Sequence, residues 1–320
     1  MSLAACGGGA GASSDEDKVT LALVAYSTPQ EAYEQIIEAY QQTSDGENVE
    51  FTTSFGASGD QSRAVEAGQN ADVVAFSLEP DITRLVKAGI VADDWNSDEH
   101  EGMVTDSVVV IATREGNPKG LSDWDDLTKP GVEVITPNPF TSGGARWNVM
   151  AAYGAASDGG KDQKAGVDYL NALFENVPVQ DDSARKALQT FTGGKGDAML
   201  AYENEAIFAQ QNGQKIDYTV PDETILIENP VAVTKTSKNA EEAQAFLDFL
   251  RTDEAQKIYQ DNGYRPVVEG VAAEGDFPQP SGLYTIDDFG GWPEVIDTFF
   301  NTDGSIMLDV ERSIGVSVEN

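Results

Sequence analysis

Short β-branched segments alternate with amphipathic segments from Val19 onward, and this alternation is the strongest constraint on the fold. Val19 to Tyr26 reads VTLALVAY, and apolar residues at helical spacing follow within Gln30 to Gln42. Further strands are expected at 49–54, 71–76, 108–113, 132–135, 177–179, 197–202 and 224–233. Helices are expected at 60–68, 80–88, 145–153, 164–174, 183–192, 205–211, 240–252 and 254–262. The alternation predicts an α/β fold, in which ligands bind beyond the carboxyl ends of strands.

The chain is strongly acidic, which limits its partners. Its 320 residues include 20 Lys and Arg against 55 Asp and Glu, a formal net charge of -35. This field repels phosphate groups, so we expect no nucleic acid partner. A chain of this length can form one large or two ordinary domains. Any anion-binding site in it would depend on local, oriented dipoles.

Cysteine and histidine are nearly absent, which limits the chemistry. Cys6 is the only cysteine, and His100 is the only histidine, within an acidic run at 93–101. We therefore expect no intramolecular disulfide, no metal site and no histidine-based catalytic triad. The sequence contains neither GxGxxG nor GxxxxGK followed by Ser or Thr, so nucleotide chemistry lacks support. No window approaches 18 apolar residues, and no transmembrane helix is expected.

The N-terminal residues suggest lipid anchoring. Leu3-Ala4-Ala5-Cys6 resembles the lipobox of a bacterial lipoprotein signal peptide. The next residues, GGGAGASSDED at 7–17, form a Gly, Ser and acid-rich tether without core residues. We interpret 1–18 as a lipobox remnant and flexible tether, with export and a lipid on Cys6. The alternative is that Cys6 is simply a free thiol.

Four strand-to-helix junctions, at 27–29, 56–59, 142–144 and 182–184, contain small and hydroxyl-bearing residues. The junction at 142–144 is the clearest, because Ser142 suits a helix N-cap and Gly143 and Gly144 let a ligand approach the backbone. The first N–H groups of a helix lack partners within the helix, and the helix dipole is positive there. Together the junctions predict a cradle for an anion, although each alone is compatible with an ordinary capped turn.

The longest motifs of the chain resemble sulfate-binding proteins, the extracytoplasmic solute receptors of sulfate and thiosulfate ABC importers. These motifs are REGNPKGLSDWDDLTKPGV at 114–132, VITPNPFTSGGARWN at 134–148, YENEA at 202–206 and TIDDFGGW at 285–292. The resemblance extends from Val19 to the C-terminus. It implies the type II periplasmic-binding-protein fold, an α/β fold of two lobes with two crossover strands and an interlobe cleft that closes by a hinge motion. It implies crossovers near Ser107–Val110 and Asn229–Val231, with lobe I at 19–108 and 231–320 and lobe II at 109–230.

The resemblance also implies which residues bind the anion. The family holds a dianion by hydrogen bonds, mostly from backbone N–H groups at helix starts, without a bound cation. By position the donors here are Ser27, Ser58, Ser142, Gly143, Gly144, Ala184 and Tyr202. Ser27 replaces the usual Asp of the family, but the contact there is through the backbone N–H. Arg146 and Arg185 lie just inside two of these helices, where they either support the loops or form ordinary surface ion pairs.

Tyr202 is the main departure from the family pattern, in which a tryptophan donates its indole N–H. Tryptophan can only donate, whereas tyrosine can donate or accept. Sulfate is fully deprotonated at neutral pH and suits an all-donor site, whereas hydrogen phosphate also needs an acceptor. An unpaired buried polar group costs ~1–3 kcal/mol, so Tyr202 could soften the rejection of phosphate. Alternatively, Tyr202 is a packed aromatic residue and another group donates in its place.

We expect a receptor that captures sulfate between its lobes, closes, and delivers the ion to the membrane permease of an ABC importer. It would act as a monomer in the periplasm or at the outer face of the cell membrane, with no cofactor and no metal. The nearest alternatives are the same class of receptor for thiosulfate, molybdate or phosphate. A two-lobed transferase or hydrolase is a more distant alternative, because no histidine lies near Ser58 or Ser142 to activate a serine. We therefore predict that the protein is not an enzyme.

Overall fold

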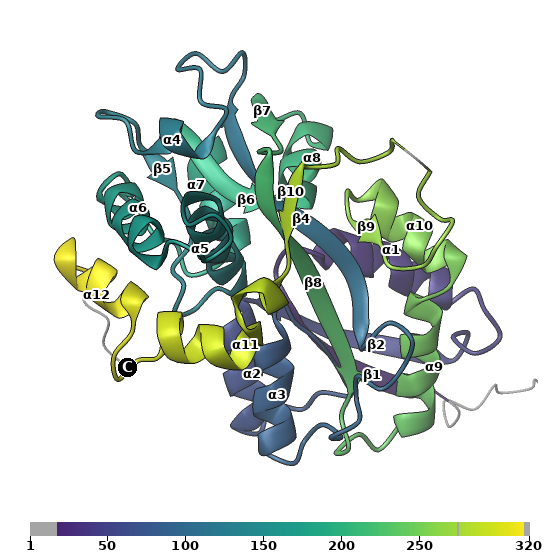
Figure 1. Cartoon of the computed structure of the whole chain (residues 1–320). Helices are drawn as coiled ribbons and strands as arrows, with labels where there is room; N and C mark the ends of the chain where they lie inside the picture. Colours follow the sequence, from purple (N-terminus) through teal and green to yellow (C-terminus); the bar gives the residue numbers. More distant parts are fainter. Residues whose placement is uncertain (1–17, 274, 317–320) are drawn as a thin grey trace, which may run out of the picture.

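The computed structural model describes residues 18–273 and 275–316, and one mixed sheet runs through both halves of this part of the chain (Figure 1). The strand order is β2-β1-β3-β8-β4-β6-β5, with β10 beside β8 and with β7 and β9 beside β4. The strands are β1 (Val19–Tyr26), β2 (Val49–Gly56), β3 (Val73–Ala75), β4 (Met103–Arg114), β5 (Val134–Ile135), β6 (Ala198–Tyr202), β7 (Ile216–Thr219), β8 (Glu223–Val233), β9 (Arg265–Pro266) and β10 (Gly282–Tyr284). Because β1 is parallel to β2 and β3, the carboxyl ends of all three meet at one edge of the sheet.

Helices fill most connections between these strands. They are α1 (Gln30–Tyr40), α2 (Ser58–Glu66), α3 (Glu79–Lys87), α4 (Trp124–Leu127), α5 (Gly143–Ala156), α6 (Gln163–Glu175), α7 (Ala184–Thr192), α8 (Glu203–Gln211), α9 (Ala240–Leu250), α10 (Asp253–Asp261), α11 (Gly291–Val295) and α12 (Ile306–Ser313). A 3₁₀ turn η2 (Ile286–Phe289) and a π turn η3 (Ile296–Phe300) flank α11. None of the helices in the described residues is both long and apolar enough to span a membrane.

The long strands β4 and β8 cross between the two lobes. Residues 105–108 of β4 pair with β8, and residues 109–113 of the same strand pair with β6 of the second lobe. At the other end, residues 231–233 of β8 pair with β3 of the first lobe. This geometry confirms the predicted two-lobed α/β fold.

Each lobe has an apolar core of its own. In the first lobe, Leu21 of β1, Tyr33 of α1 and Phe246 of α9 are buried together. In the second lobe, Trp147 of α5 packs in one cluster with Trp292 of α11 and with residues of α6, η3 and α12. The lobe boundaries remain a proposal, and this packing leads us to place the C-terminal residues from about 286 onward with lobe II rather than with lobe I.

Two differences from the sequence-based expectations affect the site. Helices α2 and α5 begin at Ser58 and Gly143, each two residues earlier than expected, so both residues lie within the first helical turn. The strand expected at 177–179 is wrong, because this segment forms no ladder. Pro178 lacks an N–H group and cannot donate to a neighbouring strand. The segment still leads into the N-cap Ser183 of α7 as expected.

Candidate anion-binding site

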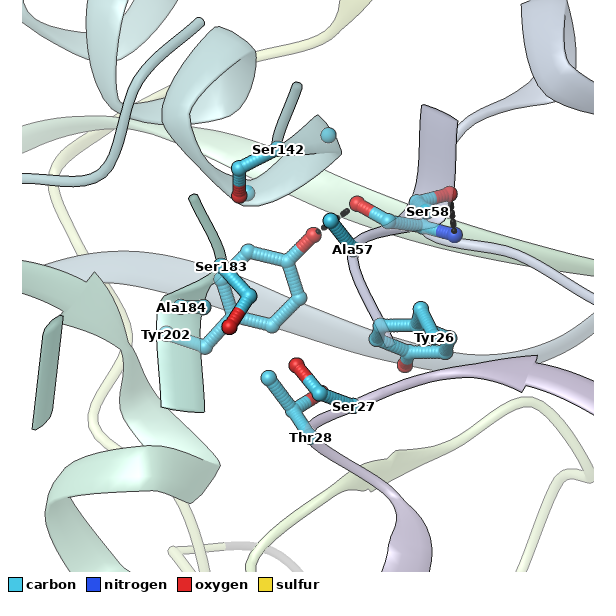
Figure 2. A pocket seen from close by; sticks show the side chains of 12 residues that line it. Tyr26, Ser27, Thr28, Ala57, Ser58, Ser142, Ser183, Ala184 and Tyr202 are labelled. Carbon is cyan, nitrogen blue, oxygen red and sulfur yellow. Dashed lines mark hydrogen bonds between the residues drawn. The ribbon is translucent and has the colours of Figure 1, made fainter. Parts of the chain in front are cut away.

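An enclosed pocket of about 10 Å³ lies where the two lobes meet (Figure 2). All seven residues expected to bind the anion line this pocket. The full lining consists of Tyr26, Ser27, Thr28, Ala57, Ser58, Ser77, Ser142, Gly143, Gly144, Ser183, Ala184 and Tyr202. These residues come from the segments that precede or begin six helices, α1, α2, α3, α5, α7 and α8. The predicted convergence of helix starts is therefore present, and it includes more helices than the four junctions expected.

Helix α5 presents two backbone N–H groups at the pocket. Ser142 caps the helix, and its Oγ accepts a hydrogen bond of 3.4 Å from the N–H of Ala145. The N–H groups of Gly143 and Gly144 form no hydrogen bond with any described residue. At α7, Ser183 caps the helix in the same way, and the N–H of Ala184 likewise lacks a protein acceptor. Unpaired N–H groups at the positive end of a helix are donors suited to an anion.

Gly143 is required by close packing across the lobe contact. A Cβ atom at this position would lie 2.5 Å from Oγ of Ser77 and 2.9 Å from Cγ of Leu78, both in the first lobe. At Gly144 a Cβ would lie 3.4 Å from the ring of Tyr202, an ordinary contact within the second lobe. Gly143 therefore lets α5 approach the first lobe closely, while the N–H groups of both glycines stay available.

The hydroxyl of Ser58 already forms two hydrogen bonds within the protein. Its Oγ donates to Oδ2 of the buried Asp81 at 2.6 Å and accepts a 3.0 Å hydrogen bond from the N–H of Ser77. In this arrangement the hydroxyl proton points at a carboxylate, so Ser58 would donate to an anion through its backbone N–H at the start of α2. Ser58, predicted as a site residue, lines the pocket, but no sequence pattern indicated Asp81 as the partner of its side chain.

Ser77 is a pocket residue that the sequence analysis did not identify. Its Oγ lies 2.6 Å from the hydroxyl of Tyr202, and its carbonyl accepts hydrogen bonds from Nε1 of Trp147 at 2.9 Å and Nδ2 of Asn229 at 3.2 Å. Figure 2 shows the hydroxyl of Tyr202 among the serines of the pocket. Ser77 follows strand β3 and precedes Pro80 in α3, so it has the same small-residue pattern as the four junctions that were recognised.

Tyr202 is buried at the pocket and remains neutral. Only 1% of its surface is exposed, and its ring packs 6.5 Å from that of Tyr26. Burial, with a smaller contribution from Tyr26, raises the pKa of Tyr202 well above its ordinary value. Because Ser77 Oγ can accept or donate, the Tyr202 hydroxyl can also serve either role within the pair.

No Lys, Arg, Asp or Glu is among the residues that line the pocket. Arg185 lies behind it, donating at 2.9 Å to the carbonyl of Thr28 and forming ion pairs with Glu31 at 2.6 Å and Glu205 at 3.0 Å. Burial lowers the pKa of Arg185, but the two carboxylates raise it by more. The net shift is upward, so the guanidinium stays charged. Since Glu31 belongs to α1 and Glu205 to α8, Arg185 connects the lobes beside the pocket.

Arg146 does not reach the pocket. Its Nε donates to the carbonyl of Pro139 at 2.8 Å, and its guanidinium lies 5.1 Å from the ring centre of Phe300. It thus supports the loop that precedes Gly143 from outside. Cys6, the other predicted functional residue, lies outside the described residues.

Comparisons with known proteins agree with this geometry. The sequence profile of the family described as "Bacterial extracellular solute-binding protein" matches residues 21–265. This chain belongs to that family. The solute-binding protein is 43% identical over 98% of its length to a sulfate-binding protein of Synechococcus elongatus, of which the match covers 93%. It is 33% identical to a thiosulfate-binding protein of Pseudomonas aeruginosa, with 89% of this chain and 90% of that protein covered.

Solved structures show the same relationship. The sulfate-binding protein SubI from Mycobacterium tuberculosis H37Rv superimposes with a TM-score of 0.86 and is 46% identical in sequence. The match covers 88% of this solute-binding protein and 99% of that chain. At this similarity the two proteins share the two-lobed fold.

Proposed function

We propose that this protein is an extracytoplasmic receptor that captures sulfate in the pocket between its lobes. The observation that carries the proposal is the lining of the pocket, which combines unpaired helix N–H groups and hydroxyls with no charged side chain. Sulfate at neutral pH has four oxygen acceptors and no proton, so it matches a site made of donors. The relatives named above, which are sulfate- and thiosulfate-binding proteins, support the same conclusion.

The size of the pocket supports a small inorganic ion. Its volume of about 10 Å³ leaves no room for a sugar, an amino acid or a nucleotide in this arrangement of the lobes. Contacts between the lobes surround it, including the N–H of Gly59 with the carbonyl of Thr141 at 3.3 Å and the indole of Trp147 with the carbonyl of Ser77. An anion that bonds to both lobes favours this closed state over an open one.

Hydrogen phosphate is the competitor that tests the donor arrangement most directly. It carries a proton, and its binding needs an acceptor in a site otherwise made of donors. Ser77 and Tyr202 are the pair that could turn a lone pair toward such a proton. Because an unsatisfied buried group costs ~1–3 kcal/mol, we expect phosphate to bind more weakly than sulfate by roughly tenfold to a few hundredfold.

A competition titration tests the proposal. Trp147 spans the lobe contact and lies 4.7 Å from the ring of Trp292, so its fluorescence should report closure. Sulfate should bind at micromolar concentrations or below, with thiosulfate, molybdate and hydrogen phosphate as competitors. Equal competition by phosphate, or no response to sulfate, would exclude the sulfate assignment. Tighter binding of thiosulfate would favour the second candidate, for which the Pseudomonas relative is the supporting observation.

The receptor would then deliver its ion to the permease of an ABC importer, held near the membrane by a lipid on Cys6. We infer a monomer without catalytic activity. Mass spectrometry of the protein purified from its host membranes tests the anchor, since a Cys6→Ala variant should lose both the lipid and the membrane association. Turnover of sulfate or phosphate esters by the purified protein would instead support an enzyme.

A further inference from the structure

A second and much larger hollow lies between α2 and α3 on one side and α11 with η3 on the other. Figure 1 shows α11 beside α3. We call this hollow the groove. Its volume is about 630 Å³, within the range of about 300–1,000 Å³ that is usual for sites of small organic ligands. The groove shares no lining residue with the central pocket.

The groove gathers cations in a chain that has few of them. Arg63, Arg84, Lys87 and Arg146 line it, which is 4 of the 20 Lys and Arg residues in the whole sequence. Three carboxylates also line it, Glu66, Glu79 and Asp297, so the local charge is +1 while the chain as a whole carries -35. Arg63 also pairs with Asp60, so the groove is close to neutral on a protein that is strongly negative as a whole.

Arg84 has bonding capacity that the protein does not use. Its Nη1 is buried and has no hydrogen-bond partner among the described residues. The nearest carboxylate oxygen, from Glu66, lies 3.8 Å from Nε on the other side of the guanidinium. A buried donor without a partner costs free energy. A ligand in the groove would contact the part of the Arg84 side chain that is exposed.

Arg146 faces the same space from the second lobe. Apart from the bond from its Nε to Pro139, its guanidinium makes no hydrogen bond and no ion pair with a described residue. Burial lowers its pKa to about 10, and Arg84 and Arg63 lower it while Asp81 raises it. A guanidinium group with unused N–H donors can bind an anionic group.

The rest of the groove combines apolar side chains with the polar side chains of Thr83, Asn301 and Thr302. Phe140, Pro293 and Ile296 contribute partly exposed surface, and the buried rings of Trp292 and Phe300 lie beneath. A free inorganic ion would leave this surface in contact with water. A ligand with a planar or aliphatic body would cover it.

We propose that the groove binds a small organic anion, in which a sulfonate, phosphate or carboxylate group lies between Arg84 and Arg146 and an apolar body covers Phe140 and Ile296. The two sites share no residue, so an anion in the groove does not compete with sulfate for the pocket.

Equilibrium dialysis with 2-naphthalenesulfonate, in the presence of saturating sulfate, tests the proposal. One equivalent should bind to the wild-type chain. Arg84→Gln and Arg146→Gln should each weaken binding about tenfold or more, since each removes charge-assisted hydrogen bonds. Arg312→Gln serves as the matched control, because this arginine is exposed on α12 and does not line the groove. The neutral analogue 2-naphthol should bind at least about tenfold more weakly than the sulfonate.

Three results would overturn the proposal: no binding at millimolar probe, displacement of the probe by sulfate, or equal affinity in the two arginine variants and the wild type. Because Arg146 also holds the Pro139 carbonyl, its variant is checked for an unchanged melting temperature and unchanged sulfate affinity. Should Arg146→Gln fail to fold, Arg84→Gln decides the question, since Arg84 makes only the long contact with the exposed Glu66.

Discussion

The central pocket has a volume of about 10 Å³ and no charged residue in its lining, whereas the groove has a volume of about 630 Å³ and four cationic side chains. In the pocket the donors are helix N–H groups and hydroxyls, fixed by the backbone. In the groove they are guanidinium groups, partly exposed and attached to long side chains. The same acidic chain thus presents two different sets of hydrogen-bond donors to an anion.

The two kinds of donor select anions by different properties. Backbone donors cannot move, so the pocket discriminates by the size of an ion and by the number of protons it carries. Guanidinium groups adapt to many anionic groups, so the groove discriminates by charge and by the apolar body attached to it. A site without formal charge also needs no desolvated counter-ion, which suits a buried position between two lobes.

The largest effect is expected from Gly143→Val. The added side chain would meet Ser77 and Leu78, prevent closure and weaken sulfate binding by about a hundredfold or more, because several hydrogen bonds are lost together. Because the groove is lined from both lobes, binding of 2-naphthalenesulfonate should weaken as well. Gly304→Val is the matched control, since a Cβ at Gly304 meets nothing within 4 Å. Calorimetry with both ligands measures the effect, and an unchanged sulfate affinity would contradict the site.

The sequence was informative about the pocket because the pocket is built from local patterns. Ser142, Gly143 and Gly144 follow a strand and begin a helix, and the physics of helix starts gives those residue types a meaning without any tertiary contact. Ser77 has the same signal and was missed. The commitment of the Ser58 hydroxyl to Asp81 has no such signal, because it joins residues 23 positions apart whose approach depends on how α2 packs on α3.

The groove could not be predicted from the sequence for the same physical reason. Arg63, Arg84 and Arg146 belong to three helices, and the apolar surface near them comes from α11 and η3 at the far end of the chain. No periodic pattern relates these positions. The sequence also gave no reason to expect that the C-terminal helices pack with α5 and α6, because the apolar residues of a short helix fit either core equally well.

A smaller effect is expected from Tyr202→Phe. Loss of the hydroxyl removes one donor to the anion and leaves Ser77 without its partner, so sulfate affinity should fall about tenfold. Tyr218→Phe is the control, because Tyr218 lies in β7 and does not line the pocket. If Tyr202→Phe binds sulfate as the wild type does, the hydroxyl contributes only to packing with Ser77.

A change of pH should alter the stability of the protein through the crossover strands β4 and β8, and it should leave sulfate affinity unchanged. Asp106 of β4 lies directly opposite Glu228 of β8 on one side and opposite Arg265 of β9 on the other. Burial, and then the charge of Glu228, raise the pKa of Asp106 to about 7, although Arg265 lowers it. The folded protein therefore holds a proton that the unfolded chain releases near pH 4, so stability falls as pH rises from about 4 to about 7.

The substitution Asp106→Asn should remove this loss of stability at higher pH. We expect the variant to be more stable than the wild type by roughly 1–2 kcal/mol at pH 8, a value reduced for the partial exposure of Asp106, and equally stable at pH 4. Urea unfolding at both pH values measures the difference, with Asp303→Asn, an exposed carboxylate, as the control. Sulfate affinity of the wild type should stay constant over the same range, because the pocket lining holds no Asp, Glu or His.

The smallest expected effect, a response to salt, differs in sign between the two sites. Raising NaCl from about 0.01 M to about 0.1 M shortens the Debye length from about 30 Å to about 10 Å. The net charge of -35 repels incoming sulfate, so screening should raise its association rate by about two- to threefold, measured by stopped-flow tryptophan fluorescence. At the groove the attraction comes from nearby, partly exposed cations, so the affinity for 2-naphthalenesulfonate should fall by a similar factor. If both sites respond in the same direction, the overall charge of the protein rather than the local lining controls anion binding at each of them.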